Sequence, residues 1–65
     1  MERNVIKDFK GVILGYIEED SNGNQICKDS RGKKLGSYDN KSNVTKDIYG
    51  RILSKGNTVV SLLYK

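Results

Sequence analysis

A twelve-residue motif occurs three times in this chain, and it constrains the fold more than any other feature. The copies begin at Asn4, Gln25 and Asn43, and they share the form Asn/Gln-Val/Ile-x-Lys-Asp-x-x-Gly-x-x-Leu-Gly/Ser. Repetition at such short intervals is typical of small supersecondary units that pack side by side. The 65 residues are expected to form a single domain. We divide it into repeats at about 4–24, 25–42 and 43–56, followed by a C-terminal strand at 57–65.

Each copy contains Lys-Asp-x-x-Gly between two short apolar runs, which predicts a β-hairpin. Aspartate favours the first position of a type I turn, because its carboxylate accepts amide protons from the residues that follow. Glycine at the fourth position can take the left-handed conformation that a bulged hairpin needs. The predicted structural turn residues are Asp8, Gly11, Asp29, Gly32, Asp47 and Gly50.

Further turn signals lie between the copies, and Asn22-Gly23 is the strongest of them. Together the turns predict an all-β fold of about seven short antiparallel strands in a meander built from three β-hairpin repeats. The expected strands lie at roughly 4–7, 12–18, 25–28, 33–38, 43–46, 51–54 and 58–64. No segment has the length and the 3.6-residue apolar period of a helix. The sheet is expected to form an open barrel or a flower-like arrangement.

The motif also predicts a repeated core. An apolar residue lies six positions before each turn glycine, and a leucine lies three positions after it, so each pair is expected to meet across its hairpin. These residues are Val5, Ile26, Val44, Leu14, Leu35 and Leu53. A small residue follows each leucine, which indicates a bulge or a tight packing site at Gly15, Gly36 and Ser54.

Two segments, 12–17 and 59–64, are apolar on both faces if they are strands. A chain of this length has little material to cover both faces of a sheet. We therefore expect a homo-oligomer, with Val60, Leu62 and Tyr64 as the candidate interface. The alternative is a wrapped sheet whose own strands cover both faces.

The net charge of +4 is unevenly distributed. Residues 1–26 contain three cationic and five anionic side chains, whereas residues 27–65 contain nine and three. This asymmetry is compatible with an anionic partner or with head-to-tail attraction between subunits. The candidate anion-binding surface consists of Lys28, Arg31, Lys33, Lys34, Lys46 and Arg51.

Tyr38 and Tyr49 are interleaved with these cations, a pattern that suits RNA or single-stranded DNA. The chain has no tryptophan and one phenylalanine, so the aromatic array typical of such domains is missing. Nucleic-acid binding is therefore the alternative function and not the favoured one. A small-ligand or carbohydrate site between subunits is a third interpretation.

The composition gives no support for catalysis, a metal or a cofactor. The chain has no histidine, and its one cysteine, Cys27, is expected to be a half-buried filler. Without histidine a zinc site would have a poor ligand set. The segment 18–24 resembles a calcium loop, but Gln25 and Arg31 stand where glycine and glutamate are required, so a hairpin turn is expected there. We expect no enzyme, no catalytic residue, no metal site and no cofactor.

A single cysteine and the lack of a leader segment predict a cytoplasmic protein. No apolar run approaches the roughly 20 residues that a membrane helix needs. No association with a membrane is therefore expected.

The repeated Lys-Asp-x-x-Gly-x-x-Leu-Gly hairpins over residues 4–56 resemble small bacterial β-hairpin-repeat domains of unknown function, most closely the four-fold β-flower type. The chain shows three clear units where that type has four. The family has no assigned activity, so the resemblance implies an all-β repeat fold and no catalytic residues. The expected function is that of a non-enzymatic, self-associating binding or structural module.

Overall fold

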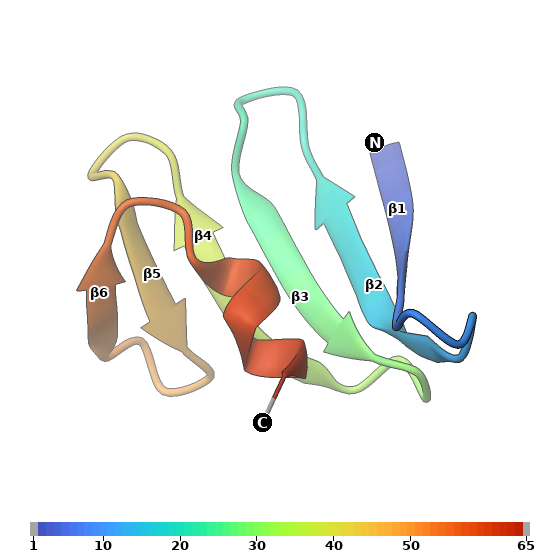
Figure 1. The fold of residues 1–65 in the computed structure, drawn as a ribbon. Helices are drawn as coiled ribbons and strands as arrows, with labels where there is room; N and C mark the ends of the chain where they lie inside the picture. The colour runs from blue at the N-terminus through green and yellow to red at the C-terminus, as the bar shows by residue number, and fades with distance from the viewer. Residues whose placement is uncertain (1, 65) are drawn as a thin grey trace.

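The computed structural model describes residues 2–64 and contains one antiparallel sheet followed by a short 3-10 helix. The sheet has the strand order β1-β2-β3-β4-β5-β6, so neighbours in sequence are neighbours in space (Figure 1). It is an all-β antiparallel meander, as the turn pattern predicted, and it is open, with β1 and β6 as its edges. The elements are β1 (Glu2–Lys7), β2 (Ile13–Glu19), β3 (Gln25–Asp29), β4 (Lys34–Asp39), β5 (Val44–Asp47), β6 (Ile52–Lys55) and the helix η1 (Val59–Leu63).

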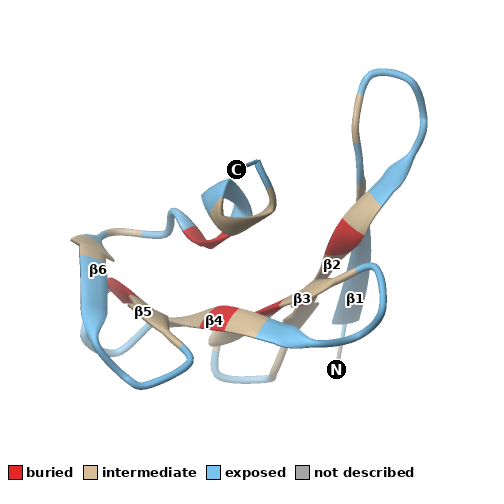
Figure 2. Cartoon of the chain, turned by 90° about the horizontal axis from the view of Figure 1, so that it is seen from below, coloured by how far each residue is buried: buried red, intermediate tan, exposed pale blue. Residues whose placement is uncertain are grey.

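The expected C-terminal strand at 57–65 is wrong, because residues Val59–Leu63 form η1. This helix lies inside the curve of the sheet, as Figure 2 shows, and it contacts β2, β3 and β4. A 3-10 helix has about three residues per turn, which brings Val59 and Leu62 to one side of it. An alternating strand would instead have placed half of this apolar run on the far side.

The three motif hairpins have the same turn. In the first, Asp8 N–H donates to the carbonyl of Val12 at 3.0 Å, and Gly11 N–H donates to the carbonyl of Asp8 at 3.0 Å. The equivalent pairs of bonds occur in the turns that begin at Asp29 and Asp47. The turn glycines all have positive φ, as this geometry requires; φ is +83° at Gly11.

Each motif hairpin also contains a bulge, and the bulge falls at the motif leucine. In the first hairpin, Lys7 pairs with Ile13 and Ile6 pairs with Gly15, so Leu14 has no partner across the strand pair. The second and third hairpins have the same register shift, which leaves Leu35 and Leu53 unpaired.

The predicted repeated core is therefore only partly correct. Val44 is buried, but Val5 is 47% exposed and Leu53 is 51% exposed. In the first strand of each hairpin, the residue that faces the core is the one that follows the predicted core residue. Two of these following residues, Cys27 and Thr45, are almost completely buried. Successive residues of a strand point to opposite faces, so this shift of one residue means that the core lies on the other face of the sheet.

The core lies between the sheet and η1. Ile17 and Cys27 are paired residues of β2 and β3, and both pack with the buried Val59 of η1. Cys27 is 0% exposed and so is fully buried, not half-buried as expected. Burial raises the pKa of its thiol. We call the face that carries Ile17, Cys27 and Gly36 the inner face, and the opposite one the outer face.

The small residues that follow the motif leucines hold the C-terminal segment. A Cβ atom on Gly15 would lie 2.6 Å from Leu63 Cδ2, and one on Gly36 would lie 2.6 Å from Leu62 Cδ1. At the third equivalent position, Ser54 Oγ lies 2.6 Å from Thr58 Oγ1. The same position in each repeat therefore contacts a different residue of the segment that covers the sheet.

Candidate functional site

A row of four side chains crosses the outer face from β2 to β5. The strand register pairs Glu18 with Ile26, Ile26 with Ser37, and Ser37 with Lys46. Because paired residues of an antiparallel sheet share a face, this row lies on the side away from η1. Ile26 and Ser37 are short, and they separate an acidic side chain on one strand from a basic one on another.

A hollow of about 350 Å³ lies over this row. Two ion pairs border it: Lys28 Nζ lies 2.9 Å from Glu18 Oε1, and Lys46 Nζ lies 3.8 Å from Asp39 Oδ2. The lining residues include Asp20 from the β2–β3 loop and Lys34 from the start of β4. The side chains of Ile26 and Ser37 thus form the base of the hollow, and charged side chains surround it.

The β2–β3 loop repeats the motif turn without the rest of the motif. Asp20 Oδ1 accepts the backbone N–H of Asn22 at 2.9 Å and of Asn24 at 3.0 Å, and Gly23 has a φ of +84°. The bond from Asn24 lowers the pKa of Asp20. The turn Asp20–Gly23 was expected only as an Asn-Gly hairpin, because it lacks the preceding lysine and the following leucine.

The carboxylate of Glu18 is also held in its charged form. The hydrogen bond from the Lys28 ammonium, together with its charge, lowers the pKa of Glu18 below the ordinary value of 4.5. Burial raises the pKa of Glu18, but by less than the interactions with Lys28 lower it. A side-chain hydrogen bond from Ser42 likewise lowers the pKa of Asp39.

These shifts predict a loss of stability in acid. A carboxyl with a lower pKa in the folded state binds fewer protons there than in the unfolded chain, so its contribution is complete above pH 4.5 for Glu18. It disappears as the pH falls through the lower, folded pKa. We expect melting temperatures to fall below that pH and the fall to be smaller in Glu18→Gln. Thermal unfolding from neutral pH to pH 2 measures this, with Glu2→Gln as the control; equal slopes would contradict the role of the Glu18 pair.

The six residues of the predicted anion-binding surface lie in two kinds of place, hairpin turns and the outer face. Arg31 and Lys33 belong to the turn between β3 and β4. Arg51 follows the β5–β6 turn, and its Nε lies 2.8 Å from Asp47 Oδ2. The remaining three, Lys28, Lys34 and Lys46, lie on the outer face.

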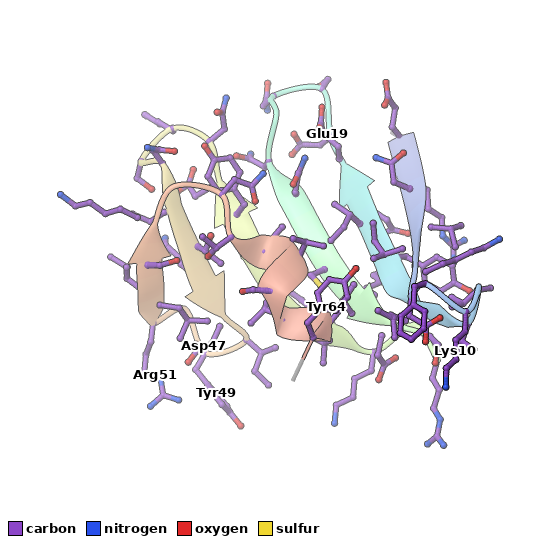
Figure 3. All side chains as sticks on the ribbon, in the orientation of Figure 1. Lys10, Glu19, Asp47, Tyr49, Arg51 and Tyr64 are labelled. Atoms are coloured by element: carbon purple, nitrogen blue, oxygen red, sulfur yellow. The ribbon has the colours of Figure 1, made fainter. Side chains whose placement is uncertain are left out.

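The interleaved tyrosines are also separated. Tyr38 packs against the inner-face core, and its hydroxyl donates to Asn43 Oδ1 at 2.7 Å. Tyr49 is exposed at the tip of the β5–β6 turn, beside Arg51 (Figure 3). The two rings therefore do not form a common stacking platform with the basic residues.

The three residues of the predicted oligomer interface have different surroundings. Leu62 packs against the inner-face core, whereas Val60 and Tyr64 are exposed. Figure 3 shows the Tyr64 side chain directly after η1, at the front of the molecule. Packing within the chain thus accounts for Val59, Leu62 and Leu63 of this apolar run and leaves Val60 and Tyr64 exposed.

Exposed apolar side chains instead lie at and near the turns of the first and third motif hairpins. Phe9 in the β1–β2 turn is 96% exposed, and Val12 and Ile13 follow it. In the third hairpin the exposed apolar residues are Ile48, Tyr49, Ile52 and Leu53. The middle hairpin carries Ser30, Arg31, Lys33 and Lys34 in this region. We call these groups the first-hairpin patch (Phe9, Val12, Ile13) and the third-hairpin patch (Ile48, Tyr49, Ile52, Leu53).

Within residues 2–64, no group of three or more metal-ligating side chains comes together, and no helix is long and apolar enough to cross a membrane. Comparison with known proteins finds no matching family model, no similar curated protein and no similar solved structure.

Proposed function

We propose that this chain is a non-enzymatic module that associates with copies of itself and acts as a binding or structural element. The observation that carries the proposal is the exposure of the first-hairpin and third-hairpin patches, defined above. Exposed apolar groups of this kind are typical of interaction surfaces. The middle hairpin, which has another hairpin on each side of it, is polar at the equivalent positions. The exposed apolar side chains are therefore confined to the two hairpins at the sides of the sheet, where another copy can reach them.

The sheet edges are a poorer basis for association. β6 has only four residues and ends in Lys55, and β1 carries Arg3 and Lys7. Short edge strands and charged edge residues discourage pairing with another chain. The proposed contact is therefore made by side chains at the hairpin ends.

The placement of the two patches favours a head-to-tail contact. Net charge does not, because Lys7, Asp8 and Lys10 flank the first-hairpin patch, whereas the acidic side chains of β1 and β2 lie at the other end of these strands. The two hairpins lie on opposite sides of the sheet (Figure 1). A contact between unlike patches of two copies thus joins the β1–β2 side of one sheet to the β5–β6 side of the next.

Light scattering on the purified protein tests this. We expect a discrete oligomer, and we expect Phe9→Ser or Ile52→Ser to raise its dissociation constant by about tenfold or more, since each removes a large apolar side chain. Ser30→Ala in the polar middle hairpin is the matched control. A wild-type protein that is monomeric at high concentration would contradict the proposal.

Mixing the two variants tests the head-to-tail geometry. A Phe9→Ser chain keeps its third-hairpin patch, and an Ile52→Ser chain keeps its first-hairpin patch. Equal amounts of the two should therefore form a heterodimer although each alone is weakened. If each variant still dimerises alone, like patches pair with like and the geometry is wrong.

The alternative, binding of RNA or single-stranded DNA, predicts copurifying material that absorbs at 260 nm and binding that weakens steeply with salt. The observation in its favour is that Arg31 and Lys33 of the β3–β4 turn form no ion pair within residues 2–64. Binding lost in the double variant Arg31→Ala, Lys33→Ala would move this function to first place.

A further inference from the structure

We propose that the hollow on the outer face binds the anionic group of a small molecule, a carboxylate or a phosphate, through Lys34, Lys46 and the hydroxyl of Ser37. This inference goes beyond self-association and is independent of it. It rests on three observations: the cause of the hollow, the placement of Lys34, and the hydrogen-bonding capacity that the lining leaves free.

The hollow exists because one repeat has a small residue where the others have large ones. Ser37 follows the small residue Gly36 on β4. The residues that follow Gly15 and Ser54 at the equivalent positions are Tyr16 and Lys55. A side chain of either size at position 37 would occupy the space between Ile26 and Lys46.

Lys34 also departs from the repeat. It pairs across the strands with Lys28, whereas the equivalent pairs are Lys7 with Ile13 and Lys46 with Ile52. Like charges directly opposite each other destabilise a sheet. Glu18 relieves only one of the two lysines, because it pairs with Lys28, and Lys34 forms no ion pair with any residue of the described part.

The acidic groups in the lining are already engaged. Glu18 accepts from Lys28, and Asp20 accepts from the amides of its own turn. Asp39 accepts the backbone N–H of Lys41 at 3.0 Å and lies near Lys46. Within residues 2–64, two hydrogen-bond donors of the lining have no partner: the ammonium of Lys34 and the hydroxyl of Ser37.

The dimensions indicate a small ligand with a short apolar part. The volume of about 350 Å³ lies at the lower end of the range for small-molecule sites. Ile26 is the apolar residue of the lining, beside Ser37. A ligand would thus place its anionic group between the two lysines and its apolar part on Ile26.

Amide chemical-shift titration of the ¹⁵N-labelled protein tests the proposal, with benzoate, phenyl phosphate and neutral benzamide as probes. We expect saturable shifts at Ile26, Ser37 and Lys46 with one or both anions and none with benzamide. Comparing benzoate with phenyl phosphate decides between a carboxylate and a phosphate site. No saturable shift with either anion up to about 10 mM would overturn the proposal.

Variants that restore the residues of the neighbouring repeats supply the second test. Ser37→Tyr fills the hollow and Lys34→Ile removes its free cation, so each should weaken anion binding by about tenfold or more. Lys34→Ile also relieves the repulsion with Lys28, so it should fold at least as well as the wild type. Lys33→Ala, one residue away in the turn, is the matched control and should bind normally. Equal binding by Lys34→Ile and wild type would show that the shifts come from elsewhere, whatever the oligomeric state.

Discussion

Replacing Gly15 with alanine is expected to lower the free energy of unfolding by about 3 kcal/mol, because atoms on two sides occupy the space that a Cβ needs. One is the backbone oxygen of Lys28 on the neighbouring strand, and the other is Leu63 Cδ2 at 2.6 Å. The oxygen cannot turn aside as a side chain can. Alanine favours a strand over glycine by only about 0.5–1 kcal/mol, so the steric conflict decides the sign.

Urea unfolding followed by circular dichroism measures this effect. A domain of this length has a total stability of about 3–10 kcal/mol, so the loss would be a large part of the whole. Gly11→Ala is the control: φ is +83° at Gly11 and no atom lies within 4 Å of a Cβ there, so only the conformational cost of about 1–2 kcal/mol applies. If Gly15→Ala is as stable as the wild type, η1 does not pack on β2 as described.

The parts of the fold that could be predicted are those set by local chemistry. A carboxylate that caps its own turn and a glycine with positive φ act within five residues, so the positions of Asp8, Asp29 and Asp47 were enough to divide the chain into hairpins. Short turns then leave an antiparallel meander as the simplest connection. The order of the strands required no knowledge of distant contacts.

The choice of the buried face could not be predicted in the same way. Val5 and Ile6 are both apolar and point to opposite faces, so the pattern of β1 does not say which face is covered. That choice is made by η1, which joins the sheet from the end of the sequence. The run 59–64 does not alternate, but a short apolar run suits a strand buried on both faces as well as it suits a helix, and the space above Gly15 and Gly36 favours the helix.

The candidate anion site is only partly predictable for a related reason. The sequence places Lys34 and Lys46 among six cations of a predicted anion-binding surface, but only the strand register brings them near Ser37 over one hollow. A signal was nevertheless present in the sequence, because an alignment of the three repeats shows a lysine and a serine where the other copies have larger or apolar residues. Departures from an internal repeat are therefore informative by themselves.

Replacing Thr45 with valine is expected to release the C-terminal segment from the sheet. Thr45 is 1% exposed, and its hydroxyl donates to the carbonyl of Gly56 at 2.8 Å and accepts the N–H of Thr58 at 3.0 Å. Valine keeps the shape but leaves both backbone groups without this partner. An unsatisfied buried group costs about 1–3 kcal/mol, so the expected loss is about 2–4 kcal/mol, less where water reaches the freed groups.

The reaction rate of the Cys27 thiol shows whether Thr45→Val loosens the contact between η1 and the sheet or destabilises the sheet itself. Cys27 is 0% exposed beneath η1, so a thiol reagent reacts only when this region opens. We expect the reaction rate in Thr45→Val to rise by about tenfold for each 1.4 kcal/mol lost, under conditions where the sheet remains folded by circular dichroism. Ser30→Ala is the control, because Ser30 is an exposed residue of the β3–β4 turn. A lower melting temperature with an unchanged thiol rate would mean that Thr45 stabilises the sheet itself and does not fasten the segment that covers it.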